Sequence, residues 1–404
     1  MKTKHHHLPR HLLAILCLLT STLCPLTPAA PKTKSPKSPP KSAQKTSTLA
    51  DSIVLPTQPT DTPAQIAAGL KSHDRALHIA GFWIRDPYIT RGPDGTYYLT
   101  GTIPPNEETR AAGDDPTPGV RVWTSPDLIT WKYYGKIYTP DLTDSQKKVI
   151  WAPELHWLPA QNRWALIHCP RENSRLVLGP IGEKTPKGPW TDAMPPAKLV
   201  PDKHDASILA DTDGTIWLIW NSKMQIYTVA PLNKTLTDYA AKPVNITPAG
   251  KRTGKISGET TNRMGHEGPG ILKFPDSKKY LWFGTAWSTD IGRRGSYNLY
   301  YATADKPTGP YGPRRFLGRF LGHGYPFQAP DGRWWCTAFT NADTPPLPKE
   351  NIQTRDLSDA PYTINKDGTT IVPLDIKILP DGDIQIRATD PAYATPGPDE
   401  AQKF

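Results

Sequence analysis

The first fifty residues of this 404-residue chain contain no aspartate or glutamate. They do contain eight lysines and arginines, so they carry eight of the ten formal positive charges of the chain. The remaining residues are therefore close to neutral. A near-neutral body lacks the basic surface on which nucleic acids bind, and we expect no nucleic-acid partner.

The sequence also lacks an apolar run long enough to span a bilayer. The apolar run at 12–19 follows a basic start and precedes small residues at 28–30, which is the order of a secretory signal. Neither Cys17 nor Cys24 follows the small residue that a bacterial lipidation site requires. We expect residues 1–30 to be a signal peptide and the protein to be secreted or periplasmic, without stable membrane insertion.

Cysteine is scarce, with four residues in the whole chain. Two of them would leave with the signal peptide, and Cys169 and Cys336 remain, each in an apolar, strand-like run. Two buried thiols and one disulfide are both compatible with this pattern.

Residues 31 to about 48 contain almost no apolar side chains and consist mainly of Lys, Pro, Ser and Thr. A segment of this composition cannot bury a core, so we expect a disordered tether. We assign 31–76 to a linker and N-terminal extension, 77–392 to one folded domain and 393–404 to a C-terminal tail.

The folded domain has no convincing amphipathic helix between its strand patterns. Instead, a strand, a turn and a second aromatic strand recur at 82–102, 206–221 and 326–339, with looser copies through 161–164 and 276–280. Five such units, roughly 50 to 70 residues apart, predict an all-β, five-bladed β-propeller. A two-sheet sandwich is the alternative for an all-β chain, but it does not predict five similar hairpins.

Three acidic residues, Asp86, Asp205 and Glu267, each open one of these strand patterns. Taken singly, such a residue is usually a turn, capping or solvated residue. In a propeller the first strand of each blade lines the central channel, so we expect the three carboxyl groups to converge there. Their recurrence at one point of the repeating unit favours a shared site over three unrelated turns.

Three carboxyl groups around a channel suit the hydrolysis of a glycosidic bond. One acid protonates the leaving oxygen, and a carboxylate on the other face, roughly 6.5–9.5 Å away, activates water. A third carboxylate can raise the pKa of the acid by like-charge repulsion and hold its orientation.

The sequence resembles glycoside hydrolase family 43 in motifs that occur in the order of that family. These motifs are Arg85-Asp86-Pro87, Trp151-Ala152-Pro153-Glu154-Leu155, Asp205 before Asp213-Gly214, Glu267-Gly268-Pro269 and Gly322-His323-Gly324. The resemblance covers about residues 77–390 and implies a five-bladed β-propeller that hydrolyses arabinosides or xylosides with inversion. It also implies that Asp86 is the general base, that Glu267 is the general acid and that Asp205 tunes and orients the acid.

The resemblance implies further site residues. His323 matches a histidine near the channel centre that is often associated, through water, with calcium or another ion; a buried histidine bonded to backbone carbonyls is the alternative. No cofactor is implied for the chemistry itself. Arg355 is the nearest match to an arginine that reads sugar hydroxyls. Trp151 would be a stacking platform in the channel wall, with a core position as the alternative.

Two departures from the family pattern leave the substrate open. Ala206 follows Asp205 where the family commonly has proline, and the charged, Pro- and Gly-rich segment 107–119 is insertion-like. Loops of this kind shape the mouth of a pocket.

Three functions therefore compete. The first is a secreted, monomeric, inverting glycosidase that acts on α-L-arabinofuranosyl or β-D-xylosyl linkages of plant-type carbohydrates. The second is a related propeller glycosidase active on another sugar, such as galactan or fructan. The third is a catalytically silent carbohydrate-binding propeller, against which the presence of all three acids argues.

Overall fold

The computed structural model describes residues 60–82, 84–103, 119–140, 150–170, 173–193, 203–222, 225–253, 258, 260–290, 295–339, 368–397 and 400–404. The chain divides into two compact units, 1–48 and 49–404, and all described residues belong to the second. The signal peptide and the tether predicted from the sequence lie outside the described residues.

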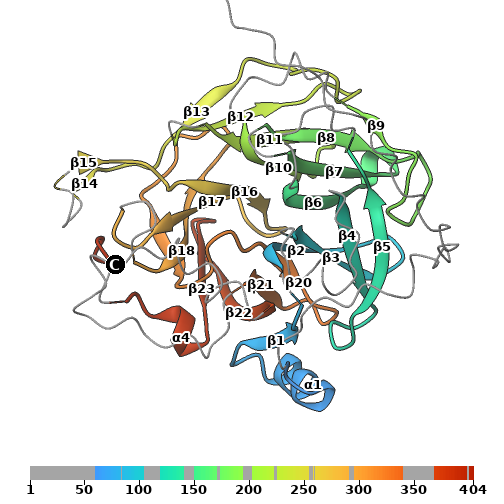
Figure 1. The fold of residues 1–404 in the computed structure, drawn as a ribbon. Coiled ribbons are helices and arrows are strands. Elements are labelled where there is room, and N and C mark those ends of the chain that lie inside the picture. The colour runs from blue at the N-terminus through green and yellow to red at the C-terminus, as the bar shows by residue number, and fades with distance from the viewer. Residues whose placement is uncertain are drawn as a thin grey trace, which may run out of the picture. The chain divides into compact units, whose positions relative to one another are not determined.

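Four antiparallel sheets of four strands each are formed by consecutive strands, arranged around a centre as in Figure 1. The first two sheets contain β2 (Arg85–Arg91), β3 (Tyr97–Thr102), β4 (Val120–Ser125) and β5 (Lys132–Tyr138), then β6 (Ile150–Leu158), β7 (Arg163–Pro170), β8 (Arg175–Leu178) and β9 (Thr191–Asp192). The next two contain β10 (His204–Ala210), β11 (Ile216–Asn221), β12 (Tyr227–Pro231) and β13 (Val244–Ile246), then β16 (Glu267–Lys273), β17 (Tyr280–Trp287), β18 (Tyr297–Ala304) and β19 (Arg315–Gly318).

The fifth sheet joins the two ends of the folded unit. Its order is β20 (Pro326–Gln328), β21 (Trp334–Ala338), β22 (Thr369–Ile378) and β1 (Leu77–Ala80), and β23 (Ile384–Ala388) also pairs with β22. Leu77 of β1 lies opposite Ile371 of β22, so the first strand closes the ring beside one of the last. The predicted five-bladed β-propeller is confirmed.

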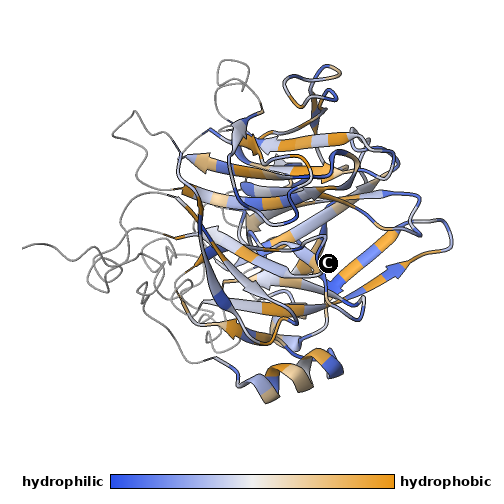
Figure 2. Ribbon diagram, turned by 90° about the vertical axis from the view of Figure 1, so that its right-hand side faces the viewer, coloured by the Kyte–Doolittle hydropathy of each residue, from blue (hydrophilic) through white to orange (hydrophobic). Residues whose placement is uncertain are grey.

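The core lies in layers between neighbouring blades. One layer joins Leu158 and Ile167 of the second blade to Ile208 and Leu218 of the third. The aromatic residues that recur after the turns enter these layers, and Trp164, Trp282 and Trp335 are almost completely buried. Figure 2 shows the apolar positions along the strands. The repeated aromatic strand therefore exists because each blade must cover the face of the next.

A short helix, α1 (Pro63–Ser72), precedes β1 within the segment assigned to the N-terminal extension. Thr62 and Gln65 form a reciprocal capping box at its start. Ile66 is buried and belongs to the apolar cluster that contains Leu77, so the helix covers the outer strand of the fifth blade.

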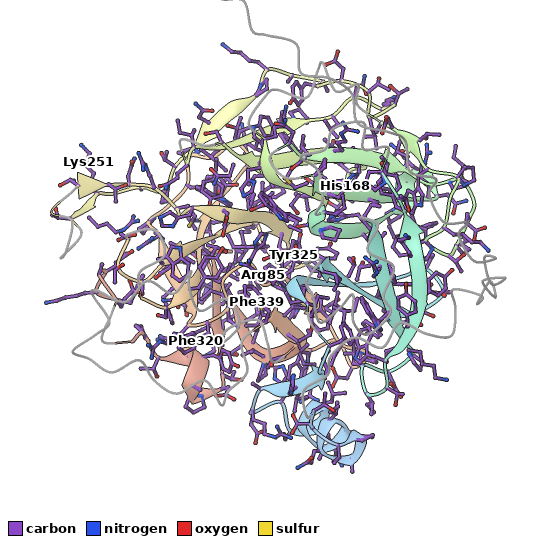
Figure 3. The ribbon with its side chains drawn as sticks, viewed as in Figure 1. Arg85, His168, Lys251, Phe320, Tyr325 and Phe339 are labelled. Carbon is purple, nitrogen blue, oxygen red and sulfur yellow. The ribbon has the colours of Figure 1, made fainter. Side chains whose placement is uncertain are left out.

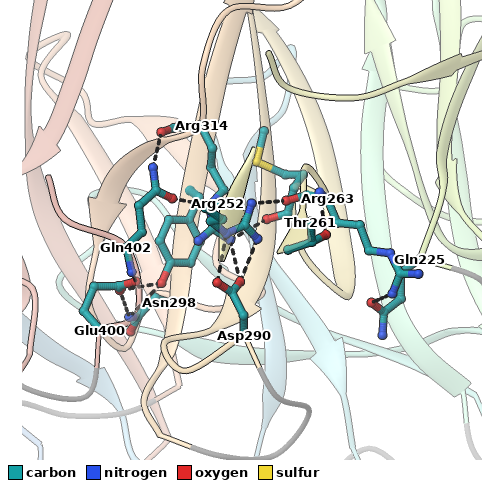
Figure 4. A network of polar contacts seen from close by, with 11 residues as sticks. Gln225, Arg252, Thr261, Arg263, Asp290, Asn298, Arg314, Glu400 and Gln402 are labelled. Atoms are coloured by element: carbon teal, nitrogen blue, oxygen red, sulfur yellow. Dashed lines mark hydrogen bonds and ion pairs between the residues drawn. The ribbon is translucent and has the colours of Figure 1, made fainter. Parts of the chain in front are cut away.

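The residues assigned to a C-terminal tail pack onto the fourth blade. Tyr393, in the short helix α4 (Pro391–Ala394), is fully buried. The hydroxyl of Tyr300 donates to Glu400 at 2.6 Å, and Nε of Arg314 donates to Gln402 at 2.8 Å, within the polar network of Figure 4. The chain end is thus fixed by charge-assisted hydrogen bonds.

A hairpin and a short turn lie outside the strands of the blades, and two buried cysteines lie within them. A two-stranded hairpin of β14 (Arg252–Thr253) and β15 (Thr260–Thr261) precedes the fourth blade, and a 3-10 turn, η2 (Pro159–Gln161), joins β6 to β7. Cys169 and Cys336 are buried on different blades, and neither forms a disulfide. Within the described ranges, the helices are too short and too polar to cross a bilayer.

Candidate active site

The inner strands of four blades share one irregularity at their start. Each has a break in register with the second strand, and the residue at the break has a left-handed backbone. These residues, called the bulge positions below, are Asp86 (φ 48°), Ala152 (φ 39°), Asp205 (φ 45°) and Gly268 (φ 60°). A bulge re-aims side chains at a strand end, and aspartate tolerates the left-handed region better than most residues.

The fifth blade has His323, also left-handed with φ 57°, just before β20. Gly268 lies close to it, because an added Cβ at Gly268 would come within 2.8 Å of the His323 ring. Only glycine therefore suits the bulge position of the fourth blade.

Glu267 does not occupy the same place in its blade as the two aspartates. It stands one residue before the bulge position, where the first three blades have Arg85, Trp151 and His204. The expectation of three acids at one equivalent point therefore holds only for Asp86 and Asp205. The structure nevertheless links all three acids, because two histidines connect them.

The carboxylate of Asp86 is held on both oxygens. Thr102 donates to Oδ2 at 2.7 Å, and Nδ1 of His323 lies 3.0 Å from Oδ1. The Thr102 hydroxyl is itself fixed, since it accepts from the backbone N–H of Ala152 at 2.7 Å. Burial raises the pKa of Asp86, but the charge and hydrogen bond of His323, with Arg85 and Thr102, outweigh it and lower the pKa. An ionised Asp86 can accept a proton.

His323 stands between two carboxylates. Its second nitrogen, Nε2, lies 3.9 Å from Oδ2 of Asp205, and its backbone N–H donates to Thr285 at 2.7 Å. Burial lowers the pKa of His323, but the charges of Asp86 and Asp205 outweigh it and raise the pKa to about 10. The association of His323 with an ion through water stays a prediction.

His204 links the other two acids. Its Nε2 lies 3.1 Å from Oδ2 of Asp205 and 3.5 Å from Oε2 of Glu267. Its Nδ1 faces the sulfur of Cys169 at 3.8 Å. Burial lowers the pKa of His204, but the charge of Asp205 and the hydrogen bonds with Cys169 and Glu267 raise it to about 12. Burial raises the pKa of Asp205 more than the two histidines lower it.

Glu267 is anchored by two tyrosines. The hydroxyl of Tyr297 donates to its Oε1, and that of Tyr227 donates to its backbone oxygen at 2.9 Å. Burial raises the pKa of Glu267, but the hydrogen bond from His204 and the charges of His323 and His204 outweigh burial, so the pKa is lowered. This direction is opposite to the one expected from Asp205, because imidazolium groups stand beside the acid.

Asp86 and His323 line a small pocket together with Glu154, Phe283 and Tyr325, among others. Figure 3 shows Arg85, Tyr325 and Phe339 near the centre of the ring. Glu154 is the other carboxylate of this lining, and it accepts from His156 at 2.8 Å and from Ser207 at 2.6 Å. Those bonds fix the Glu154 side chain between β6 and β10.

The remaining predicted residues have different outcomes. Trp151 lies at the strand start beside the acids, edge to face with the ring of His204 at 5.9 Å, and its role as a stacking platform stays a prediction. Arg355 lies outside the described residues. Another arginine, Arg85, does reach the site, with its guanidinium 5.8 Å from the ring centre of Phe339.

Thr102, His204 and Tyr297 contact the acids but were not predicted as site residues from the sequence. His204 had a local signal, since it directly precedes Asp205 in the strand start. Thr102 and Tyr297 belong to β3 and β18, away from the acidic motifs, and they reach the acids only through sheet pairing and blade packing. No local pattern could have identified them.

The site thus offers an ionised carboxylate at Asp86 and a second carboxyl group, Glu267, beside a cationic imidazole. One can take a proton while the other passes one to a departing oxygen. That division of roles fits acid–base cleavage of a glycosidic bond.

Comparison with known proteins agrees with this chemistry. A family model described as glycosyl hydrolases family 43 matches residues 79–370. A beta-D-galactofuranosidase of Aspergillus niger is 25% identical over 236 residues, covering 52% of this chain and 62% of the relative. This chain therefore spans less than two thirds of that protein.

Two solved structures share the fold. An endo-1,4-beta-xylanase from Bacteroides thetaiotaomicron is 23% identical with a TM-score of 0.52, over 75% of this chain and 94% of the other. An exo-1,5-alpha-L-arabinanase from a bovine ruminal metagenomic library is 18% identical with a TM-score of 0.50. The match covers 76% of this chain and 97% of the arabinanase. At these identities the likeness supports the propeller fold alone.

Proposed function

Because the chain belongs to glycosyl hydrolases family 43, we propose that it is an inverting glycosidase acting on α-L-arabinofuranosyl or β-D-xylosyl linkages of plant-type carbohydrates. The observation that carries this proposal is the chain of contacts from Asp86 through His323, Asp205 and His204 to Glu267. It couples the proposed base to the proposed acid through two histidines.

Asp86 is the general base in this proposal. It removes a proton from water, whose oxygen bonds to the anomeric carbon. The bond to the leaving oxygen breaks, and that oxygen keeps the electron pair and takes a proton from Glu267. Water attacks from the face opposite the leaving group, so the product has inverted configuration.

His204 supplies the proton that Glu267 delivers. The lowered pKa of Glu267 favours its carboxylate form at rest, and Nε2 of His204, 3.5 Å from Oε2, is the cationic donor that can return the proton. Asp205 holds His204 by its other contact, at 3.1 Å. Asp205 therefore acts on the acid through the imidazole, rather than only by direct repulsion.

The comparison with known proteins suggests one alternative substrate, a galactofuranosyl unit. The curated relative is named a beta-D-galactofuranosidase, and a galactofuranosyl unit shares the five-membered ring of an arabinofuranosyl unit. The third possible function is a propeller that binds carbohydrate without cleaving it.

A panel of aryl α-L-arabinofuranoside, β-D-xylopyranoside and β-D-galactofuranoside, followed by NMR, tests this proposal. We expect turnover of one of the first two with initial inversion, and its loss in Asp86→Asn. Asp375→Asn is the matched control, because Asp375 is an exposed carboxylate of β22, 52% accessible and paired with Lys377. Retained configuration, or binding without turnover, would contradict the proposal.

We also propose that residues 1–30 direct export and are removed, and that the mature protein is a monomer. The proposal rests on the basic, apolar and small-residue order of that segment. Amino-terminal sequencing of protein from the culture fluid or periplasm tests export. Size-exclusion chromatography with light scattering tests the monomer.

A further inference from the structure

A sulfur, a nitrogen and an oxygen ligand meet beside the acid pair. The sulfur of Cys169, a ring nitrogen of His204 and a carboxylate oxygen of Asp205 lie within 4.8 Å of one another. They come from β7 of the second blade and β10 of the third, which contact each other. None of the three is a member of the apolar cluster between the second and third blades.

The spacing suits a single metal ion. Zinc bonds to sulfur at about 2.3 Å and to nitrogen at about 2.0–2.1 Å, which in a tetrahedron places the two ligand atoms roughly 3.5 Å apart. Sγ of Cys169 and Nδ1 of His204 are 3.8 Å apart and face each other. The carboxylate of Asp205, now 3.1 Å from Nε2, turns to bind as the third ligand.

The ligand types select the ion. Thiolate and imidazole favour zinc and similar borderline-soft ions, whereas calcium and magnesium prefer sites made of oxygen. An ion can enter past His204, whose side chain is 26% exposed, although that of Asp205 is only 3% exposed. Binding must remove one proton from the buried thiol and one from the imidazolium, so it strengthens as pH rises.

We propose that Cys169, His204 and Asp205 form a zinc site and that the bound ion inhibits the glycosidase. The inhibition rests on the proposed function; the site itself does not. A zinc ion held by Nδ1 and Sγ draws the Asp205 carboxylate away from Nε2 of His204 and puts a divalent charge beside Glu267. The contacts through which His204 and Asp205 hold the acid are then changed.

Binding is tested first, on the full chain and without turnover. Co²⁺, a spectroscopic substitute for Zn²⁺, should give a thiolate-to-metal absorption band that saturates at one ion per chain and that Zn²⁺ removes. Cys169→Ser should lose this band. Cys336→Ser is the matched control, because Cys336 is equally buried but lies on β21 of the fifth blade. It should keep the band.

Inhibition is tested second, with an aryl glycoside in a buffer that does not chelate metals. Zn²⁺ should lower turnover at least tenfold, and EDTA should restore it. Cys169→Ser should need at least tenfold more Zn²⁺ for the same loss, relative to its own zinc-free rate, while Cys336→Ser responds like the wild type.

Absence of the Co²⁺–thiolate band in the wild-type protein would overturn the site, as would an equal band in Cys169→Ser. If Cys169→Ser does not fold, His204→Gln serves instead and should weaken the band and lower the Co²⁺ affinity at least tenfold. If the wild-type protein shows the Co²⁺–thiolate band but keeps full turnover in saturating Zn²⁺, the proposed inhibition is wrong while the metal site stands. A protein that hydrolyses no glycoside fails the proposed function, yet its Co²⁺ spectrum still decides the site.

Discussion

Thr102→Val should weaken the proposed base without changing the shape of the site. Valine has nearly the volume of threonine, and residue 102 is only 4% exposed, so the change removes a hydroxyl and little else. The hydroxyl donates to Asp86 at 2.7 Å and accepts from the Ala152 N–H at 2.7 Å. Both bonds disappear together.

Two magnitudes follow from those two bonds. A hydrogen bond to a charged group contributes about 1.5–3 kcal/mol. Because the bond stabilises the ionised form of Asp86, its loss should raise the pKa of that carboxyl by about one unit or more. The Ala152 N–H, left unsatisfied and buried, adds about 1–3 kcal/mol of lost folding stability.

The assay is the pH dependence of kcat/KM on an aryl glycoside, beside thermal unfolding. The acidic limb reports the ionisation of the base and should move to higher pH by about one unit in Thr102→Val. Thr102→Ser keeps the hydroxyl and should keep the wild-type limb. A limb that does not move in Thr102→Val, in a protein that is still folded, would refute the assignment of Asp86 as the base.

Three further outcomes are expected. Glu267→Gln should slow aryl glycosides with poor leaving groups at least a hundredfold more than those with acidic phenols, and equal losses would contradict its role as the acid. Burial raises the pKa of Glu400 to about 7. Protonated Glu400 therefore adds to the free energy of unfolding fully below about pH 4.5, and this contribution of roughly 3 kcal/mol is lost as pH rises through 7. In urea unfolding from pH 4 to 8, the free energy of unfolding should decline less for Glu400→Gln than for the wild type. An equal decline in both proteins would contradict the raised pKa of Glu400. Removing residues 1–48 should leave turnover and the melting temperature unchanged, and a clear drop in either would show that the segment stabilises the domain.

The blades could be predicted because their signal is local. A turn such as Asp213-Gly214 followed by Ile216 and Trp217 specifies a hairpin within about ten residues, whatever lies elsewhere in the chain. The helix α1 has a similar local signal, the capping box from Thr62 to Gln65, although no helix was predicted there. Local chemistry is readable from one sequence.

The site could be predicted only in part, because its geometry is not local. The acids Asp86, Asp205 and Glu267 were expected to converge, and a chain of contacts does link them. The offset of Glu267 by one residue depends on where the bulge falls, which the strand pattern does not encode. The reversed shift in the pKa of Glu267 depends on the rotamers of His204 and His323, and these are set by packing between blades.

The closure of the ring has a consequence for biogenesis. Leu77 emerges early from the ribosome but pairs with Ile371, so it must wait for roughly 290 further residues before its partner exists. The first strand and the fifth blade therefore assemble last, after the rest of the propeller has been synthesised. A nascent chain in this open state keeps unpaired strand edges, which are sites for pairing with other chains.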